Sequence, residues 1–340
     1  MKRIKDIDIL RAIAIILVIV GHTPYPGFNP ELHKWIYAFH IPLFFFVSGL
    51  SLYFTNYHNL NLKKNFKKRF NRIYLPYLIW SIALALPSIS VMTIPKILYG
   101  THQSIASVSN SSLWFLPVLF FATIFLDLIL FFSYKKNWQK YLPFLLIIFF
   151  LIVLLIPSQS SIQYLLGGHN LPFGIDVVPM AILFMLSGYL FQIHRKTKEL
   201  KIPILISVPL IILSITILTY FSLHNNTNYV LMAENRYGNY LYFFIAAFSG
   251  IIASFLISFT IARHTSKLSK LMQKIGSDTM IIFILHKYPL QLINDLILLI
   301  PVAHISNYFI IPLYLIFALI ICIPISSLIK KHASILIGKL

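Results

Sequence analysis

Acidic residues are scarce in this sequence, which has 9 Asp and Glu residues against 28 Lys and Arg residues. All charged residues together make up 11% of the chain, whereas 58% of its 340 residues are hydrophobic. Soluble domains contain roughly 25% charged residues, so this composition excludes an ordinary soluble protein. Because a helix satisfies its own backbone hydrogen bonds in lipid, the long apolar runs predict an all-α integral membrane protein.

Cysteine is also scarce, since the only one is Cys322 in the last apolar run. A single cysteine excludes an intrachain disulfide and any metal cluster built from several cysteines. The 12 histidines show no paired ligand spacing on one helical face, so we expect no metal site. The sequence also shows no short repeat and no soluble catalytic module, so any chemistry has to use side chains within the membrane.

Ten apolar segments predict a bundle of ten transmembrane helices. They cover residues 7–23, 35–54, 74–99, 113–134, 141–157, 176–193, 202–221, 239–262, 278–300 and 307–328. The polar stretches between them are too short to fold alone, so we expect residues 1–340 to form one transmembrane domain without an appended soluble domain. Lys2, Arg3 and Lys5 make the first segment resemble a signal peptide. No small-residue cleavage site follows it, so we expect the segment to be retained.

The basic residues concentrate in alternate loops between these segments. With a cytoplasmic N-terminus, 23 of the 28 Lys and Arg residues fall in cytoplasmic loops, and only Lys34, Lys96 and Arg236 fall in the opposite loops. This bias predicts an even number of helices with both termini on the cytoplasmic side of a cell membrane. The formal net charge of +19 is then a topology signal that also suits contact with anionic lipid of the bilayer, and it requires no nucleic-acid partner.

Three ionisable side chains, Asp8, Arg11 and His22, interrupt the first apolar segment. On a helix, Arg11 and His22 differ by about 20° around the axis and by roughly 16 Å along it, so they share a face. Asp8 precedes Arg11 by one helical turn and can pair with it, which makes a buried arginine tolerable. Ionisable groups at such depth are costly and commonly functional. The alternative is a charge pair at a helix start followed by a histidine at the membrane interface.

The second apolar segment and the loop behind it form another candidate region. Pro42 is expected to kink the segment, and Gly49 allows close packing of helices. The loop then supplies Lys68, Arg69 and Arg72. The two arginines are neighbours on one face of a helix, and their guanidinium groups suit a phosphate-rich ligand. The alternative is an ordinary positive-inside cluster.

Five fragments occur in an order that is typical of one membrane family. They are Arg11 with His22, Phe44-Phe-Phe-Val-Ser-Gly49, Arg69-Phe-Asn-Arg72-Ile-Tyr-Leu-Pro76, Leu113-Trp-Phe-Leu116 and Ile275-Gly-Ser-Asp-Thr-Met-Ile-Ile-Phe-Ile-Leu-His286. Together they resemble membrane acyltransferase family 3, and especially its stand-alone sugar O-acetyltransferases, which include the fucose 4-O-acetylase-like proteins. The resemblance extends from residue 5 to about residue 330, nearly the whole chain.

This resemblance implies that the protein transfers an acyl group, usually acetyl from cytoplasmic acetyl-CoA, to a glycan on the far side of the membrane. It implies that His22 is the essential histidine, Arg11 its basic partner in the motif, and Arg69 with Arg72 the Arg-x-x-Arg element. Some members have an extracellular esterase-like domain. This chain shows none, so we expect it to acylate a surface polysaccharide or lipid-linked sugar directly or to rely on a separate protein.

A mechanism can be outlined from these residues. We expect the phosphates of acetyl-CoA at Lys68, Arg69 and Arg72, and its pantetheine arm along the polar stripe of the first segment. A neutral imidazole at His22 suits proton abstraction from a sugar hydroxyl. An acyl-imidazole on His22 is the competing chemistry, and the sequence leaves both open. An oxyanion stabiliser is also required, and no residue stands out for this role.

Polar and aromatic residues at the outer ends of segments are candidates for acceptor contacts. They are Asp176, His169, Trp114, Arg236 and His40. Asp176 is the best of them because it lies in a Leu-Pro-Phe-Gly-Ile-Asp run that is also family-like, whereas interfacial tryptophan is often a membrane anchor. Asp278 and His286, in the same predicted segment, could form a proton relay or make a structural hydrogen bond to a neighbouring helix.

Two other classes of protein compete with this interpretation. A transporter or flippase for a lipid-linked sugar would also use intramembrane charges and kinked helices, although no inverted repeat is evident. A scaffold for glycan assembly would leave the buried Arg11 and His22 without a purpose. A phosphate-binding arginine pair inside and a titratable histidine outside favour group transfer across the membrane.

Overall fold

The computed structural model describes residues 5–24, 28–156, 161, 171–195, 202–299 and 307–339. These residues form helices and turns without a β-strand, which confirms the all-α prediction. They fall into two compact units. Unit 1 comprises Met1–Phe44, Lys201–Val230 and Tyr237–His332, and unit 2 comprises Phe45–Leu200, Leu231–Arg236 and Ala333–Leu340. The expectation of one transmembrane domain stays a prediction.

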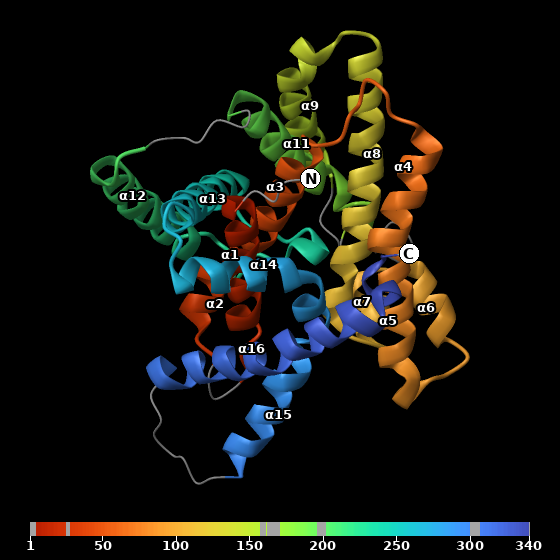
Figure 1. The fold of residues 1–340 in the computed structure, drawn as a ribbon, viewed down its shortest axis with the longest axis vertical. Helices are drawn as coiled ribbons and strands as arrows, with labels where there is room; N and C mark the ends of the chain where they lie inside the picture. The colour runs from red at the N-terminus through yellow and green to blue at the C-terminus, as the bar shows by residue number, and fades with distance from the viewer. Residues whose placement is uncertain are drawn as a thin grey trace. The chain divides into compact units, whose positions relative to one another are not determined.

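Unit 1 is built around a buried first helix. Its helices are α1 (Lys5–Gly21), α2 (Pro30–Tyr37), α12 (Ile204–Leu223), α13 (Tyr240–Ala262), α14 (Lys267–Leu285), α15 (Lys287–Leu298) and α16 (Asn307–His332). Helix α1 packs against α13 and α14, α12 packs along α13, and α16 lies against α14 and α15 (Figure 1). Ile9, Ile15 and Ile19 of α1 are fully buried, so α1 forms the core of this unit.

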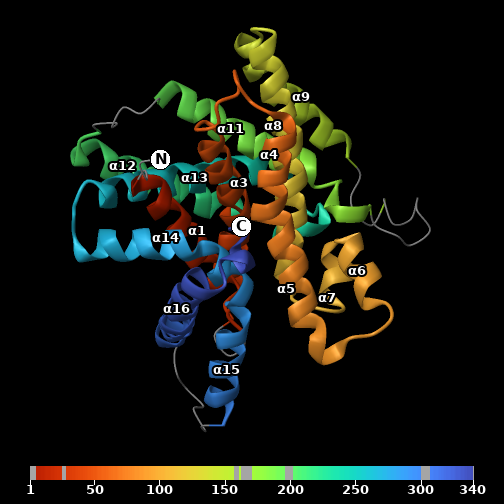
Figure 2. The same ribbon diagram turned by 45° about the vertical axis from the view of Figure 1, so that its right-hand side comes forward.

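The backbones of α1 and α14 approach each other closely at Gly276. A Cβ atom at this position would lie 1.8 Å from the carbonyl oxygen of Asp8, a separation that real atoms do not tolerate. The two helices also meet at their ends, where the ring of His286 contacts the ring of His22. They therefore lie side by side between these two contacts (Figure 2).

A buried carboxylate joins α14 to α16. Asp278 is 1% exposed and forms ion pairs with Lys274 of α14 and Lys330 of α16. Lys330 also donates a hydrogen bond of 2.9 Å to the carbonyl oxygen of Ser277, and Lys274 donates one of 3.0 Å to the hydroxyl of Ser327. These contacts attach the middle of α14 to the end of α16.

Unit 2 contains the remaining helices and most of the turns. Its α-helices are α4 (Leu62–Arg69), α5 (Leu75–Ala85), α6 (Thr93–Tyr99), α7 (His102–Ala106), α8 (Phe115–Lys135), α9 (Leu142–Leu155) and α11 (Val178–Arg195). Its shorter elements are η1 (Phe70–Tyr74), η2 (Leu86–Ser88), η3 (Ser111–Trp114), η4 (Gln139–Tyr141), η5 (Pro172–Gly174), η6 (Met232–Glu234) and η7 (Ser334–Ile337). Helix α8 packs against α11, α4 and η1, and α9 packs against α11.

Two glycines let α3 (His40–Leu52) cross α11 at close range within unit 2. A Cβ atom on Gly49 would lie 1.9 Å from the carbonyl oxygen of Met185, and one on Gly188 would lie 2.1 Å from that of Phe46. Small residues of this kind bring helix backbones together in membranes. The predicted packing role of Gly49 is therefore confirmed.

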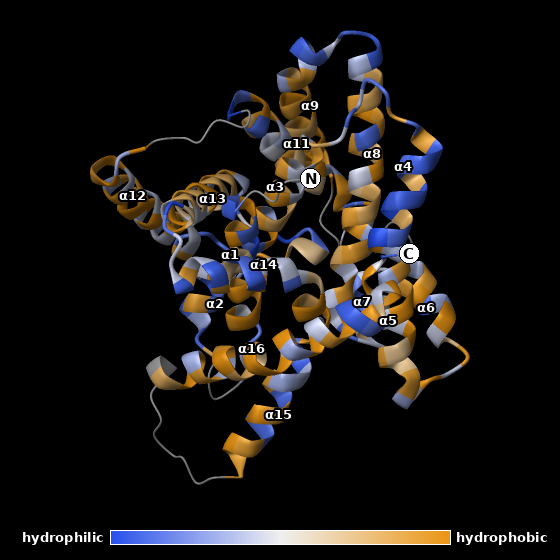
Figure 3. Cartoon of the chain, in the orientation of Figure 1, coloured by the Kyte–Doolittle hydropathy of each residue, from blue (hydrophilic) through white to orange (hydrophobic). Residues whose placement is uncertain are grey.

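The helices have the length and composition of membrane spans. In the part of the chain that is described, six helical stretches are long and apolar enough to cross a membrane. They are Pro30–Leu52, Ser111–Lys135, Pro172–Arg195, Ile204–Leu223, Tyr240–Ala262 and Phe309–His332. Helices α14 and α15, bent by 67°, make a seventh if they are counted as one span. Apolar side chains such as Leu205, which is 86% exposed, point outward as lipid-facing side chains do. Hydrophobic residues dominate these helices, whereas α4 is hydrophilic (Figure 3). The protein is a multi-pass membrane protein, and the total of ten spans stays a prediction.

Three of the predicted segments are interrupted near prolines. The kink in the second segment was predicted, whereas the prediction of one continuous helix is wrong for the other two. The segment at 74–99 breaks between α5 and α6, where Pro87 lies. The second segment divides into α2 and α3 just before Pro42, where a kink was predicted. The segment at 278–300 starts earlier, within α14, and bends just before Pro289. Proline has no N–H to donate to the carbonyl four residues earlier, so each helix opens at that point.

Replacement of Gly276 tests the close packing of α1 and α14. The Gly276→Ala variant should lower the free energy of unfolding by about 1–3 kcal/mol, because the added methyl group forces the backbones apart. The midpoint of thermal unfolding in detergent measures this effect. The control is Val208→Ile, which adds one carbon at a position that is 44% exposed and should leave the midpoint unchanged. Equal midpoints for Gly276→Ala and the unmodified protein would contradict the close packing.

Candidate active site

His22 lies directly after the last turn of α1. Its backbone N–H donates to the carbonyl oxygen of Val18 at 3.1 Å, so the helical repeat continues through the histidine. Its ring Nδ1 lies 2.8 Å from the same carbonyl oxygen and 3.2 Å from Nε2 of His286. The imidazole is therefore held from two sides, by its own helix and by the end of α14.

His286 is fully buried, and its own helix orients its ring. The ring Nδ1 lies 2.8 Å from the carbonyl oxygen of Phe283 and 3.2 Å from that of Ile282. The centroids of the His286 and His22 rings are 4.9 Å apart, and their planes are inclined by 54°. Of the two roles considered from the sequence, the structural hydrogen bond to a neighbouring helix is present.

A cluster of aromatic and imidazole rings extends from His22. The ring centroid of Tyr37 lies 6.2 Å from that of His22, 4.7 Å from that of His40 and 3.9 Å from that of His33. Tyr229 packs against both Tyr37 and His33. His40, predicted as an acceptor contact, is only 2% exposed. Within unit 1, Tyr37 of α2 thus lies beside His22, and the rings of His33, His40 and Tyr229 lie around Tyr37.

The ion pair predicted between Asp8 and Arg11 is present. Arg11 Nη1 lies 3.0 Å from Asp8 Oδ1, and the side chains of Arg11 and Asp8 are 36% and 8% exposed. A carboxylate that is nearly buried needs such a cation, because an unpaired charge would lose its hydration without compensation. Asp8 also lies at the close contact with Gly276, so its charge is neutralised where α1 meets α14.

Arg69, predicted to bind phosphate, is part of a buried network in unit 2. Its Nε donates to Asp127 Oδ2 at 2.8 Å, and its Nη2 lies 3.2 Å from both Asp127 Oδ1 and the hydroxyl of Thr55. Tyr57 and Asn65 donate to the same carboxylate at 2.6 and 2.8 Å. Burial and the neighbouring Asp127 carboxylate raise the pKa of the Tyr57 phenol, so it remains a donor. Arg69 therefore ties α4 to α8.

Lys68 and Arg72, the other two residues of the basic cluster, are exposed. Partial burial of its ammonium group and the nearby charges of Arg72 and Arg69 lower the pKa of Lys68. Between the two arginines the chain enters the π-helix η1, in which the N–H of Leu75 bonds to the carbonyl oxygen of Phe70. The wider turn replaces the α-helical spacing from which a shared face was predicted, and such turns are frequent at functional sites.

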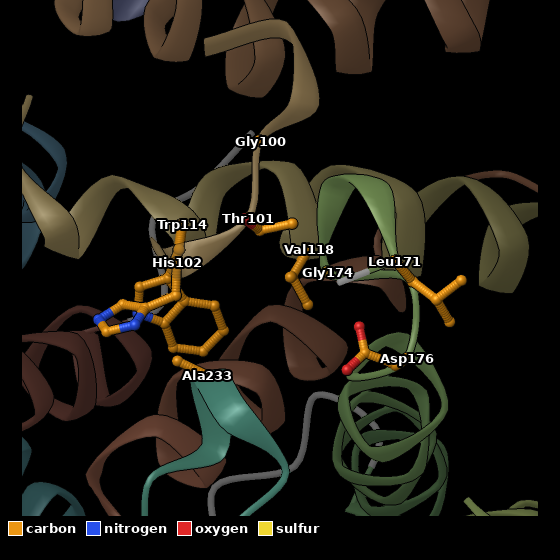
Figure 4. A pocket seen from close by; sticks show the side chains of 9 residues that line it. All are labelled: Gly100, Thr101, His102, Trp114, Val118, Leu171, Gly174, Asp176 and Ala233. Atoms are coloured by element: carbon orange, nitrogen blue, oxygen red, sulfur yellow. The ribbon is translucent and has the colours of Figure 1, made fainter. Parts of the chain in front are cut away.

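A small pocket in unit 2 contains two of the predicted acceptor contacts (Figure 4). It is lined by Gly100, Thr101, His102, Trp114, Val118, Leu171, Gly174, Asp176 and Ala233. Trp114 and Asp176 lie on opposite sides of it (Figure 4). Its empty space, including the open mouth, is about 250 Å³. The enclosed part holds only about one water molecule, so it is large enough for a single hydroxyl group and not for a sugar ring.

A turn at residues 231–236 supplies polar groups to the edge of this pocket. Asn235, which adopts a left-handed backbone conformation with φ of 49°, donates to Asp176 Oδ2 at 2.5 Å. Glu234 contacts Nδ1 of His102 at 3.2 Å and pairs with Arg236 at 2.9 Å. Arg236, another predicted acceptor contact, is thus neutralised by Glu234 at the pocket edge.

The structure divides the predicted site residues between the two units. Unit 1 contains Asp8, Arg11, His22 and His40, and unit 2 contains Lys68, Arg69, Arg72, Trp114, Asp176 and Arg236. His169 lies outside the described residues. Among the residues that are described, no group of three or more His, Cys, Asp and Glu side chains is arranged to hold a metal ion.

Comparison with protein families gives a match over nearly the whole chain. The acyltransferase 3 model, whose description is acyltransferase domain, matches residues 4–327. The chain belongs to acyltransferase family 3. No curated protein and no solved structure matches it. The predicted family is therefore confirmed, the protein is a membrane acyltransferase, and the alternative of a transporter is not favoured.

Sequence reasoning missed one buried carboxylate of this acyltransferase, Asp127. The available signal was a lone acidic residue inside the 21-residue apolar helix α8, because ionisable groups in such helices rarely lack a role. Its partner Arg69 lies 58 residues earlier in the chain, so the pairing could not be predicted from spacing.

The contrast between Arg69 and Arg72 predicts different effects of replacing them. Arg69→Met should destabilise the protein by about 3–5 kcal/mol, because it leaves the buried Asp127 carboxylate without its cation. Arg72→Met should leave stability nearly unchanged, because Arg72 is exposed. Thermal unfolding of both variants in detergent compares the two effects. A double variant, Arg69→Met with Asp127→Leu, should recover part of the loss. Equal midpoints for the two single variants would exclude the structural role of Arg69.

Proposed function

We propose that this acyltransferase transfers an acetyl group from cytoplasmic acetyl-CoA to a hydroxyl group of a glycan, either a surface polysaccharide or a lipid-linked sugar. The observation that carries the proposal is the His22 imidazole, which is oriented from two sides at the end of a helix in a member of acyltransferase family 3. An oriented imidazole suits proton transfer at a reacting hydroxyl.

The donor site is proposed at Lys68 and Arg72. Both side chains are exposed, whereas Arg69 is occupied with Asp127. The lowered pKa of Lys68 supports an anionic ligand here, because a phosphate would offset the repulsion between these cations. Arg69 then contributes by holding the start of the π-helix that carries Arg72.

His22 is proposed to act on the acceptor hydroxyl. Its imidazole takes the proton while the hydroxyl oxygen forms a bond to the thioester carbonyl carbon. The carbon–sulfur bond then breaks, and the imidazolium returns the proton to the departing thiolate. An acyl-imidazole on His22 is the second candidate, in which the acyl group first bonds to the ring nitrogen. We propose that the ion pair between Asp8 and Arg11 stabilises α1, the helix that ends at His22, at its cytoplasmic end.

The acceptor contacts are proposed at two places. The ring of Tyr37, which contacts His22, offers a flat surface on which a sugar can stack, and the buried His40 is proposed to support that ring. Trp114 and Asp176 offer an aromatic face and a carboxylate at a pocket that admits one hydroxyl group. Arg236, and also His169, belong to the same proposed set of acceptor contacts.

The proposed topology has ten crossings and both termini in the cytoplasm of a cell membrane. The alternation of basic loops in the sequence supports it, since the cluster with Lys68 and Arg72 then faces cytoplasmic acetyl-CoA.

Sealed inside-out vesicles test this function. Vesicles loaded with oligosaccharide and lipid-linked sugar from the host membrane, and given labelled acetyl-CoA outside, should acquire acetylated glycan in the lumen and release CoA outside. His22→Ala should lower this rate by about 10²–10⁴-fold, because general base catalysis contributes that much. Mass spectrometry of the luminal glycan measures the product. Intact acetyl-CoA in the lumen, or glycan movement without acetylation, would support a transporter instead.

Binding of CoA tests the donor site separately. Lys68→Ala and Arg72→Ala should each weaken CoA binding by roughly tenfold or more, because each removes a charge-assisted contact with phosphate. Isothermal titration calorimetry in detergent measures the affinity. Lys135→Ala is the matched control, since Lys135 is an exposed basic residue in another predicted cytoplasmic loop. Unchanged affinity in both test variants would leave the cluster with a topological role only.

A further inference from the structure

The contacts of His286 determine which of its ring nitrogens carries hydrogen. Its Nδ1 lies 2.8 Å from the carbonyl oxygen of Phe283 and 3.2 Å from that of Ile282. Carbonyl oxygens only accept hydrogen bonds, so Nδ1 has to be the donor. The ring is fully buried, and burial disfavours a charged imidazole. A neutral His286 therefore has its lone pair on Nε2, the nitrogen that faces His22.

The same reasoning applies to His22. Its Nδ1 faces the Val18 carbonyl oxygen at 2.8 Å and the His286 Nε2 at 3.2 Å, and both of these atoms are acceptors. The hydrogen of a neutral His22 ring therefore resides on Nδ1, shared between the two acceptors. The lone pair is left on His22 Nε2, the nitrogen on the far side of the ring from these two contacts.

We propose that His286 is a positioning residue that holds His22 in the tautomer with hydrogen on Nδ1, so that Nε2 is the reactive nitrogen. This inference rests on the proposed function of His22 in acyl transfer. It holds for both candidate mechanisms, because a base and a nucleophile each need a lone pair directed at the substrate.

The arrangement also stabilises the charged form of His22 during the reaction. When Nε2 takes the proton of the acceptor hydroxyl, Nδ1 keeps its hydrogen, and its bonds to Val18 and His286 become charge-assisted. The proton leaves from Nε2 to the thiolate, so His286 gains and loses no proton. Other groups near His22 are Tyr37 of α2, His40 of α3 and Lys287 of α15. The positive charge of Lys287 disfavours an imidazolium at His22. The hydrogen bond that His286 Nε2 accepts from His22 is therefore more important for stabilising that charged form.

Two variants of His286 separate hydrogen bonding from simple packing. In His286→Gln the side-chain amide reaches the former position of Nε2, so its oxygen can still accept from His22. In His286→Asn the shorter side chain reaches only the former position of Nδ1 and offers His22 no acceptor. His194→Asn is the matched control, because His194 is exposed and makes the same contact with a carbonyl one turn earlier, that of Leu190.

The first measurement is nitrogen-15 NMR of histidine-labelled protein, with the His22→Ala spectrum subtracted to isolate the His22 signals. We expect a protonated Nδ1 and an unprotonated Nε2 in the unmodified protein, the same in His286→Gln, and a mixture of tautomers in His286→Asn. A protonated Nε2 in the unmodified, neutral His22 would overturn the proposal. This measurement requires no acyl transfer, so it stands even if the proposed function fails.

The second measurement is the rate of acetyl transfer in vesicles. His286→Asn should lower kcat by about 10²-fold with KM changed little, because the base is disoriented while the substrate sites are intact. His286→Gln should keep kcat within about tenfold of the unmodified enzyme, and His194→Asn should have no effect. Equal losses in His286→Gln and His286→Asn would mean that His286 only packs against His22, and the proposal would fail.

Discussion

The close packing of α1 on α14 is the contact on which the candidate active site depends. Gly276 lets the backbone of α14 approach that of Asp8 more closely than any larger residue permits. The same two helices end at His22 and His286, whose rings touch. Apolar burial gives little drive for helix association in lipid, so close backbone packing has to supply much of it. A glycine in the middle of α14, packed against the first turn of α1, thus helps to set the relation of the two imidazoles that follow these helices.

Three of the 9 acidic residues are buried partners of basic ones. Asp8, Asp127 and Asp278 are all buried, and they pair with Arg11, with Arg69, and with Lys274 and Lys330. Lipid provides no water to hydrate such groups, so each carboxylate is stable only beside a cation. Two of the three also connect different helices, α4 with α8 and α14 with α16. These buried ion pairs therefore help to specify which helices pack together in this protein.

Basic residues consequently have more than one role. Lys274, Lys330 and Arg69 belong to the alternate loops from which the topology was predicted, yet all three also neutralise buried carboxylates. Lys68 and Arg72 in the same loop as Arg69 are exposed and stay available for a ligand. The positive-inside pattern alone does not distinguish these roles, because it depends only on the position of a residue in the chain.

The sequence by itself determined the class of the protein and its family. Low charge and long apolar runs require helices in a membrane, since no other common structure satisfies backbone groups within one segment. The pair of Asp8 and Arg11 could also be predicted, because residues one turn apart on a helix are neighbours. Pro42 signalled a break, but Pro87 and Pro289 were not recognised as ends of helices within their segments.

Only the tertiary structure decided which distant residues meet. His22 and His286 are 264 residues apart in the chain, and Arg69 and Asp127 are 58 apart. Local spacing gives the face of a helix on which a side chain lies, but not the helix that packs against that face. That choice depends on where small residues such as Gly276 and Gly49 allow backbones to approach and where buried charges find partners. The sequence therefore supplied the candidate histidine, and the packing of α14 supplied the neighbour that orients it.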